Sequence, residues 1–362
     1  GADARGGQMI RTWHLEDPQQ SLVLASHDDR LPEIIYWGAA LPASEDLTSL
    51  AQACRPDVTG GMLDRAPEVS ICPESTQSFL GEPGLIAYDA KGRPLRPALR
   101  FEAEECDENG VTLIYADGAT GLRYWANFAL DPRTGLVSAR AAIESAEPIT
   151  LHWLAAPVFP APQLADEMLE FSGRWCGEFR IAPTPWQAGQ RVRDNHTGRT
   201  GHEHFPGLIL PARGATKTAG ETRAFHYGWS GGHRMVAEEL PDGRRQIQFG
   251  HASGSEPQPD TGFETATLFA AFSQEGSNGC ARAFQRHLRH TAPQISPRPV
   301  HYNCWEAVYF DHNLSELQEI ASRAAALGAE RFVLDDGWFG RRDDDTTSLG
   351  DWQVDRRKYP DG

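Results

Sequence analysis

The sequence predicts an antiparallel β-sandwich followed by the beginning of a parallel α/β domain. Between residues 101 and 144, turn signals such as Asn109-Gly110 and Asp117-Gly118 recur every 8 to 14 residues, and apolar and polar residues alternate between them. Such spacing and alternation are typical of half-buried antiparallel strands. After residue 300 the pattern changes to strand, helix, strand, which indicates a βαβ unit. With 362 residues, the chain is long enough for two domains.

The sandwich is predicted to cover residues 9–280. Residues 1–8, which precede Met9, are expected to be a cloning remnant and are left out of the fold. A sandwich of this length is large, so an enlarged one is expected. Its expected strands include 22–25, 34–37, 111–115, 136–143 and a hairpin of 233–240 with 244–249 around the turn Pro241-Asp242-Gly243.

Residues 281–299 are expected to form a helix and then a linker. Within 281–290, Phe284 and Leu288 would lie on one face of a helix. Three prolines follow, and proline lacks a backbone N–H and fixes φ, so a linker is expected there. They are Pro293, Pro297 and Pro299. Residues 300–362 are then expected to begin the parallel domain.

The parallel domain is predicted to start with a strand, a helix and a second strand. The first strand is expected within 302–308, and the second, a continuous apolar run, at 332–334. Asn313 can cap the helix between them, with Glu316 at position N3 to complete a capping box. The helix is expected to end before Gly328. Its apolar stripe is predicted to consist of Leu317, Ile320, Ala321, Ala324 and Leu327.

Polar and aromatic residues follow both predicted strands. Trp305 and Glu306 lie towards the end of the first, and Asp335 and Asp336 come at the end of the second. In parallel α/β structures the active site is built at the carboxyl ends of the strands. These four positions are therefore the candidates for a functional site.

Composition and charge exclude several classes of function. The net charge is −16, and so acidic a surface repels a phosphate backbone, which argues against nucleic-acid binding. No apolar run approaches the roughly 20 residues that span a bilayer, so no membrane partner is expected. The six cysteines are dispersed without a C-x-x-C, which argues against zinc and redox motifs. Without a signal peptide, reduced thiols in a cytoplasmic protein are expected.

Two motifs are expected to be structural. Gly228-Trp229-Ser230-Gly231-Gly232 matches the nucleophile elbow G-x-S-x-G, but the elbow needs a helix after it, and a hairpin is predicted instead. His202-Glu203-His204 lacks the i, i+4 spacing of a helical metal site, and Pro206 follows at once. A structural or interface role is expected for this segment, and no metal site is predicted.

The segment Asp335-Asp336-Gly337-Trp338 has two interpretations. In the first, one carboxylate caps a turn while the other meets solvent. In the second, both bind a sugar, because carboxylates accept several hydrogen bonds from neighbouring hydroxyls and tryptophan supplies an apolar face for the ring. Trp305, Trp338 and Trp352 all lie in the last 60 residues, beside these carboxylates, which favours the sugar interpretation.

Several segments closely resemble the α-galactosidases of glycoside hydrolase family 36. They are residues 301–310, 332–340 and 349–352, and further upstream 198–205 and 229–234. The resemblance implies an N-terminal antiparallel β-supersandwich, then a (β/α)8 TIM barrel, then a small C-terminal β domain. It also implies retaining hydrolysis of terminal α-D-galactosyl residues, from oligosaccharides such as melibiose and raffinose, without metal or cofactor.

The resemblance further implies site residues and an assembly. In the family, the tryptophan that matches Trp305 and the aspartates that match Asp335 and Asp336 contact galactose, the aspartates through its 4- and 6-hydroxyls. Similar enzymes are commonly homotetramers in which loops of the sandwich domain lie near a neighbour's active site. A galactoside substrate and a homo-oligomer are therefore the expected partners.

One departure from the family concerns the catalytic carboxylates. A barrel takes about 250 residues, and only 63 follow from Val300, so the barrel is expected to be truncated after its second strand. The family's nucleophile lies in a Lys-Trp-Asp type motif on a later strand, and its acid/base lies further on. Both are expected beyond Gly362, so no catalytic role is given to Asp335, Asp336 or Glu306.

Three alternatives to the galactosidase interpretation stay open. The protein could be an α-N-acetylgalactosaminidase or a galactosyl-transferring relative, because the residues that read the sugar's 2-position are not in this sequence. It could also be a carbohydrate-binding sandwich fragment without enzymatic activity. The 362-residue chain alone is expected to be inactive.

Overall fold

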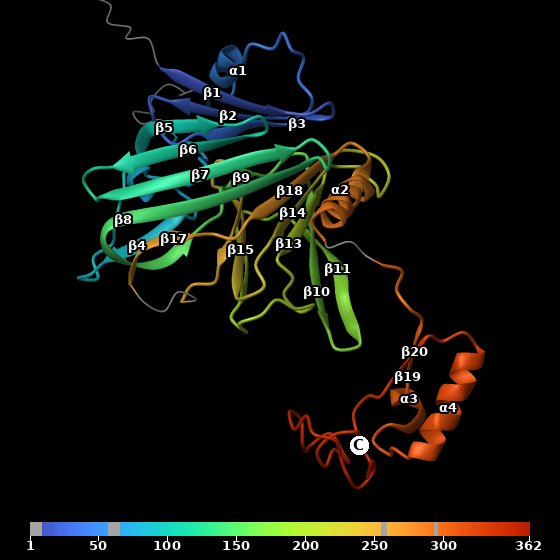
Figure 1. Cartoon of the computed structure of the whole chain (residues 1–362). Helices are drawn as coiled ribbons and strands as arrows, with labels where there is room; N and C mark the ends of the chain where they lie inside the picture. Colours follow the sequence, from blue (N-terminus) through green and yellow to red (C-terminus); the bar gives the residue numbers. More distant parts are fainter. Residues whose placement is uncertain (1–8, 57–65, 255–258, 293–295) are drawn as a thin grey trace, which may run out of the picture. The chain divides into compact units, whose positions relative to one another are not determined.

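The computed structural model describes residues 9–56, 66–254, 259–292 and 296–362 (Figure 1). The chain divides into two compact units, one that ends at His290 and one that begins at Thr291. Residues 1–8, expected to be a cloning remnant, and Pro293 of the expected linker lie outside the described residues.

The part of the first unit that the structure describes is built from three antiparallel sheets. A three-stranded sheet has the order β1 (Ile10–Glu16), β2 (Gln20–His27), β3 (Glu33–Ala39). A four-stranded sheet has the order β12 (Gly189–Asn195), β15 (His233–Glu239), β16 (Arg245–His251), β9 (Phe159–Pro160). The expected strands 22–25 and 34–37 are confirmed within β2 and β3, and the expected hairpin is confirmed as β15 and β16.

An eleven-stranded sheet is the largest element of the first unit. Its order is β11 (Gly177–Pro185), β10 (Glu167–Arg174), β13 (Gly207–Pro211), β14 (Thr222–Tyr227), β18 (Leu268–Ser273), β8 (Leu136–Leu154), β7 (Leu122–Asp131), β6 (Gly110–Asp117), β5 (Arg100–Cys106). Two more strands, β4 (Leu85–Asp89) and β17 (Asp260–Glu264), also pair with β8. β8 is longer than the expected 136–143 because its second half continues into these pairings.

Alternating side chains explain why these segments form strands. In β7 every second residue is buried, from Leu122 through Tyr124, Ala126 and Phe128 to Leu130, while the residues between them are only partly buried or exposed. This two-residue period places one face of the strand on a core. The turn after β7 is closed by the Asp131 carboxylate, which accepts a hydrogen bond from the Arg133 backbone N–H.

The three sheets share one hydrophobic core. Phe159 of β9 is fully buried and meets Trp37 of β3, Phe128 of β7 and Phe225 of β14 at ring-centroid distances of 5.2, 6.2 and 5.5 Å. Because these rings come from all three sheets, the core holds the unit together as an enlarged sandwich.

Among the described residues, the first unit holds three helical segments. They are α1 (Leu47–Ala53), the 3₁₀ turn Ser75–Gln77 and α2 (Gly276–Thr291). α2 begins five residues before the expected segment 281–290, because Cys280 and Ala283 pack on the sheet at β14 and β18 and extend the helix through poor helix formers. Phe284 packs on this cluster, whereas Leu288, one helical turn further on, is exposed.

The second unit contains a parallel pair of strands. In chain order its elements are β19 (His301–Asn303), α3 (Trp305–Val308), α4 (Leu314–Ala326) and β20 (Arg331–Val333). Residues 334–362 follow without a further helix or strand. The predicted cap is confirmed, because the Asn313 side chain accepts hydrogen bonds from the backbone of Ser315 and Glu316. Gly328 follows the helix with φ +99°, as a C′ glycine does.

Two predictions about the second unit are wrong in detail. The strand expected within 302–308 ends at Asn303, and Trp305 and Glu306 lie in α3, because the Asn303 side chain accepts a hydrogen bond from the Trp305 backbone and starts a helical turn. Within the stripe of α4, Leu317 and Ala324 are buried, whereas Leu327 is 90% exposed.

Candidate functional site

The candidate site lies at the carboxyl ends of the two parallel strands. Asn303, the last residue of β19, pairs with Val333, the last residue of β20. The backbone N–H of Cys304 donates to the carbonyl of Val333 at 3.1 Å and extends this pairing by one bond. The segments that follow the strands therefore start side by side, and they carry Trp305 on one and Asp335 with Asp336 on the other.

Trp305 is the first residue of α3 and is held by aromatic neighbours. Its partly buried ring meets those of Tyr309 and Phe310 edge to face, at centroid distances of 5.2 and 4.9 Å. Tyr309 has φ +49°, a conformation that a bulky residue rarely adopts. The indole is thus presented from a short helix on a tightly turned backbone.

Asp335 is tied to Trp305 through Asn303. The Asn303 Nδ2 donates to Asp335 Oδ2 at 2.7 Å, and the Asn303 Oδ1 accepts from the Trp305 backbone N–H at 2.8 Å. The second oxygen of Asp335 accepts from the Asp336 backbone N–H at 2.8 Å. One asparagine therefore fixes the tryptophan and the first aspartate relative to each other.

Asp336 is held by a buried arginine. Arg342 Nη2 and Nε both donate to Asp336 Oδ2, at 3.0 and 3.3 Å, and the arginine side chain is only 6% exposed. Arg342 also donates to the Thr347 carbonyl and lies over the Phe310 ring at 5.4 Å. Both bonds from Arg342 end on one carboxylate oxygen, so Oδ1 of Asp336 is left to accept other hydrogen bonds.

The turn behind the aspartates packs closely on buried groups. Gly337 has φ +103°, and a Cβ there would come within 2.9 Å of the Phe310 carbonyl, so the position requires glycine. His312 is buried and its Nδ1 lies 2.7 Å from the Tyr359 hydroxyl. Burial and, to a smaller extent, the nearby Lys358 cation lower the pKa of His312, because both disfavour the charged imidazolium.

The structure unites some of the predicted residues and separates others. Trp305, Asp335 and Asp336, which we refer to as the clamp, are linked through Asn303 and the Asp336 backbone. Trp338 and Trp352 instead contact Phe339, at 5.1 and 4.7 Å, and Trp352 is 63% exposed. The aspartates lie just beyond the carboxyl end of β20 rather than within the strand.

Sequence reasoning missed Asn303 and Arg342. Asn303 could have been found as a polar residue at the end of a parallel strand, two positions before the Trp305-Glu306 pair already singled out. Arg342 belongs to the charged run 341–345, whose composition is typical of a solvated loop, but its burial and its bond to Asp336 show that it belongs to the site.

Comparison with known protein families decides the affiliation of the chain. Residues 30–256 match the glycosyl hydrolase family 36 N-terminal domain, and residues 262–362 match the Melibiase domain. The chain belongs to glycosyl hydrolase family 36. The α-galactosidase of Escherichia coli is 36% identical over 359 residues, which are 96% of this chain and 49% of that protein. AgaA of Geobacillus stearothermophilus is 30% identical over 283 residues, 75% of this chain and 39% of AgaA.

Solved family 36 structures share the fold. The α-galactosidase of Lactobacillus brevis superposes with a TM-score of 0.85 at 24% identity, covering 97% of this chain and 52% of that one. A variant of AgaA in complex with 1-deoxygalactonojirimycin gives a TM-score of 0.83 at 23% identity, covering 96% and 53%. The fold is thus a β-sandwich followed by the start of a TIM barrel, as predicted. The chain spans about half the length of the relatives it matches.

The two motifs set aside in the sequence lie between strands of the first unit, residues 228–232 between β14 and β15 and residues 202–204 between β12 and β13. Strand β15, not a helix, follows Ser230, so the segment is no nucleophile elbow. His202 Nε2 lies 3.1 Å from the Glu203 carboxylate, and Phe205 stacks on His226 at 4.9 Å. Within the described ranges, no group of three or more His, Cys, Asp or Glu side chains is arranged to hold a metal ion.

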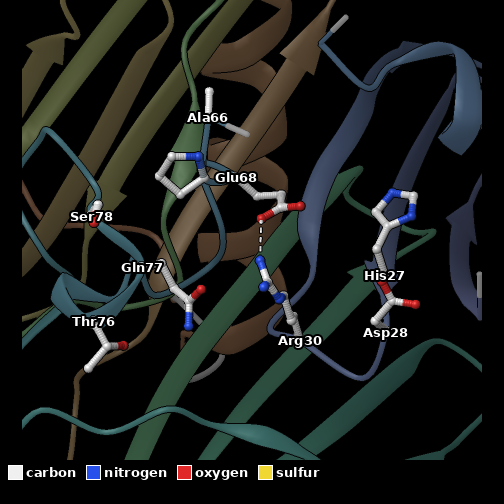
Figure 2. A pocket seen from close by; sticks show the side chains of 9 residues that line it. His27, Asp28, Arg30, Ala66, Glu68, Thr76, Gln77 and Ser78 are labelled. Atoms are coloured by element: carbon white, nitrogen blue, oxygen red, sulfur yellow. Dashed lines mark ion pairs between the residues drawn. The ribbon is translucent and has the colours of Figure 1, made fainter. Parts of the chain in front are cut away.

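The sandwich contains a polar pocket of about 410 Å³ (Figure 2). In Figure 2, Arg30 and Glu68 point toward each other at 3.9 Å, with His27 and Asp28 on one side. The described lining residues include no tryptophan, tyrosine or phenylalanine, so the pocket lacks the apolar face on which a sugar ring packs. No helix in the described part of the chain combines the length and apolar character needed to cross a bilayer.

Proposed function

We propose that the complete protein to which this chain belongs is a retaining α-galactosidase that hydrolyses terminal α-D-galactosyl residues of oligosaccharides such as melibiose and raffinose. The observation that carries the proposal is the clamp, in which Asn303 holds Trp305 and Asp335 together at the carboxyl ends of parallel strands. AgaA variants bind 1-deoxygalactonojirimycin, raffinose and stachyose in their crystal structures, which supports a galactoside as the ligand.

The chemistry of the clamp suits a polyhydroxylated ring. A carboxylate accepts up to about four hydrogen bonds, and Asp335 and Asp336 each use two of theirs within the protein. The remaining acceptor positions would receive the 4- and 6-hydroxyls of galactose as charge-assisted bonds. The partly exposed face of Trp305 would pack against the C–H groups of the ring.

The same hydrogen bonds favour a binding role over a catalytic one for these aspartates. A retaining glycosidase needs a carboxylate nucleophile and a carboxylic acid about 5–5.5 Å apart on either side of the glycosidic bond. Both oxygens of Asp335 already accept protein hydrogen bonds, and Asp336 is paired with a buried arginine. We therefore assign nucleophile and acid/base to the half of the relatives that this chain does not span.

Two measurements on the complete protein test the proposal. It should release p-nitrophenol from p-nitrophenyl α-galactoside, and proton NMR of the first-formed sugar should show α-galactose. The 362-residue chain alone should be inactive, because loss of a positioned general acid removes roughly 10²–10⁴ in rate and loss of the nucleophile adds to this. Initial β-galactose would refute retention, and turnover by the short chain within tenfold of the complete protein would refute the assignment of the catalytic residues.

A homo-oligomer is part of the same proposal. β11 is an edge strand of the largest sheet, and Trp175, Phe179 and Ile181 on the β10–β11 hairpin are 79%, 53% and 57% exposed. Exposed apolar groups on a sheet edge favour association with another chain. Sedimentation of the complete protein should give a tetramer, and Trp175→Ser should lower the association constant; a monomer at micromolar concentration would refute the assembly.

A further inference from the structure

We propose that Lys358 is a positioning residue of the clamp, whose ammonium group sets the separation between Trp305 and the two aspartates. The inference rests on the proposed galactoside-binding function of the clamp. It concerns a residue that touches neither the indole nor the carboxylates and that acts through the backbone behind them.

Lys358 has all three of its donors engaged. Its Nζ donates to the Phe310 carbonyl at 2.9 Å and to the Gly337 carbonyl at 3.1 Å, and lies 2.9 Å from Asp343 Oδ1. A lysine ammonium carries three N–H groups, so this set of partners is complete. The side chain is only 15% exposed. Lys358 therefore links separate chain segments through its hydrogen bonds and is not a mobile surface cation.

The two carbonyl partners lie directly behind the clamp. Gly337 follows Asp336 in the chain, so the bond to its carbonyl holds the end of the turn that carries the aspartates. Phe310 packs edge to face on Trp305 at 4.9 Å and 87°, so the bond to its carbonyl holds the ring that supports the indole. One ammonium thus joins the support of the aromatic face to the support of the carboxylates.

Electrostatics explain why a cation is needed at this point. The Phe310 and Gly337 carbonyls both point at Nζ, and the two segments approach so closely that a Cβ on Gly337 would lie 2.9 Å from the Phe310 oxygen. Without a cation between them, two converging carbonyl dipoles repel each other and lose their hydrogen-bond donor. Removal of the charge should therefore let the two segments move apart.

Arg342 connects the same two segments at a second point. Its guanidinium bonds Asp336 and lies over the Phe310 ring. A planar guanidinium suits a carboxylate and an aromatic face, whereas a compact ammonium suits carbonyls that converge from different directions. Because the two cations use different geometries, an arginine at position 358 should restore the charge but only part of the positioning.

A hollow beside Lys358 gives no support for a direct ligand-binding role. It has a volume of about 490 Å³ and is lined by residues 308–311, Asp343 and Lys358. None of the clamp residues lines it, and the three N–H groups of Lys358 are already engaged. The ammonium group of Lys358 can therefore affect substrate binding only by positioning the clamp residues.

The test compares Lys358→Met and Lys358→Arg with a matched control in the complete protein. Methionine keeps much of the length of the side chain and removes the charge. Lys91→Met makes the same chemical change at an exposed lysine of the first unit. The measurements are kcat and KM for the p-nitrophenyl α-galactoside, the inhibition constant of free galactose, and the melting temperature.

A positioning role predicts a specific pattern. Lys358→Met should raise KM and the galactose inhibition constant at least tenfold and lower kcat/KM about 100-fold, the size of effect that a misplacement of about 1 Å produces. Lys358→Arg should fall between Lys358→Met and the unaltered protein, and Lys91→Met should match the unaltered protein. A fall in kcat alone, with KM and the inhibition constant unchanged, would show only a loss of folded protein and would overturn the inference.

A milder variant covers the case in which Lys358→Met does not fold. Asp343→Asn removes the counter-charge that fixes Nζ between the two carbonyls, so the ammonium is held there less firmly, and the galactose inhibition constant should rise about three- to tenfold. An unchanged constant would overturn the positioning role. If the unaltered complete protein has no α-galactosidase activity, the proposed function fails and the inference fails with it; if it is active and Lys358→Met keeps its KM and inhibition constant, only the positioning role fails.

Discussion

Asp336→Asn in the complete protein removes one carboxylate of the clamp and changes little else in shape. Asp336 uses its two oxygens for different tasks: Oδ2 accepts both bonds from Arg342, and Oδ1 is available to a sugar hydroxyl. Asparagine has only one oxygen. If that oxygen faces Arg342, an NH2 group faces the sugar; if it faces the sugar, the NH2 group meets a buried cation.

The structure sets the size of the expected loss. A hydrogen bond to a charged group contributes about 1.5–3 kcal/mol, and the substitution also leaves a 6% exposed guanidinium without its counter-charge. Asp336 itself is 29% exposed, so water screens part of the second effect. A total of about 2–4 kcal/mol of transition-state binding is expected, equivalent to a fall in kcat/KM of about 30- to 1000-fold.

The assay is kcat/KM for the p-nitrophenyl α-galactoside, with Asp345→Asn as control. Asp345 belongs to the charged run 341–345, is exposed, and makes the same change in net charge when substituted. The control should stay within twofold of the unaltered protein. If Asp336→Asn also stays within threefold, Asp336 does not bind the substrate and the second oxygen has been assigned wrongly.

Three further predictions follow from the hydrogen bonds and burial of single residues. Asp335→Asn should lower kcat/KM about 10- to 150-fold, because both its oxygens accept protein hydrogen bonds and an amide can satisfy only one; an unchanged value would contradict this. Asn303→Ala should raise KM at least tenfold with little change in melting temperature, because the residue is exposed but links Trp305 to Asp335; equal KM values would argue against that link. Burial raises the pKa of Glu74 to about 7, so the destabilisation of the folded state by the buried, ionised Glu74 carboxylate grows as pH rises from 4.5 to 7. Glu74→Gln should therefore leave unfolding in urea unchanged at pH values near 4.5 and raise the unfolding free energy by about 1–3 kcal/mol above pH 7; identical pH dependence in the two proteins would refute it.

Much of the fold could be predicted because its signals are local. The alternation in β7 and the turn residues around it belong to one short stretch of chain, and so do the Asn313 cap and Gly328 at the two ends of α4. Boundaries set by packing could not be predicted in this way. α2 starts at Gly276 because Cys280 and Ala283 meet strands β14 and β18, and nothing in the segment 276–279 favours a helix by itself.

The same distinction between local signals and packing applies to the candidate site. Trp305, Asp335 and Asp336 could be proposed from sequence because the carboxyl ends of parallel strands meet at one edge, whatever the rest of the chain does. The residues that hold them could not. Arg342 stands in a charged run that looks solvated, and only the fold buries it against Phe310.

Lys358 shows why such support escapes sequence reasoning. Two of its three partners are backbone carbonyls, 48 and 21 residues away, and a carbonyl oxygen is present at every position whatever the side chain. No pattern of residue types can therefore mark where a lysine will find two converging carbonyls. Side chains that contact a ligand have to carry particular chemical groups, so the residue types in the sequence can indicate them. Side chains that act through the backbone can be identified only when the fold brings the segments together.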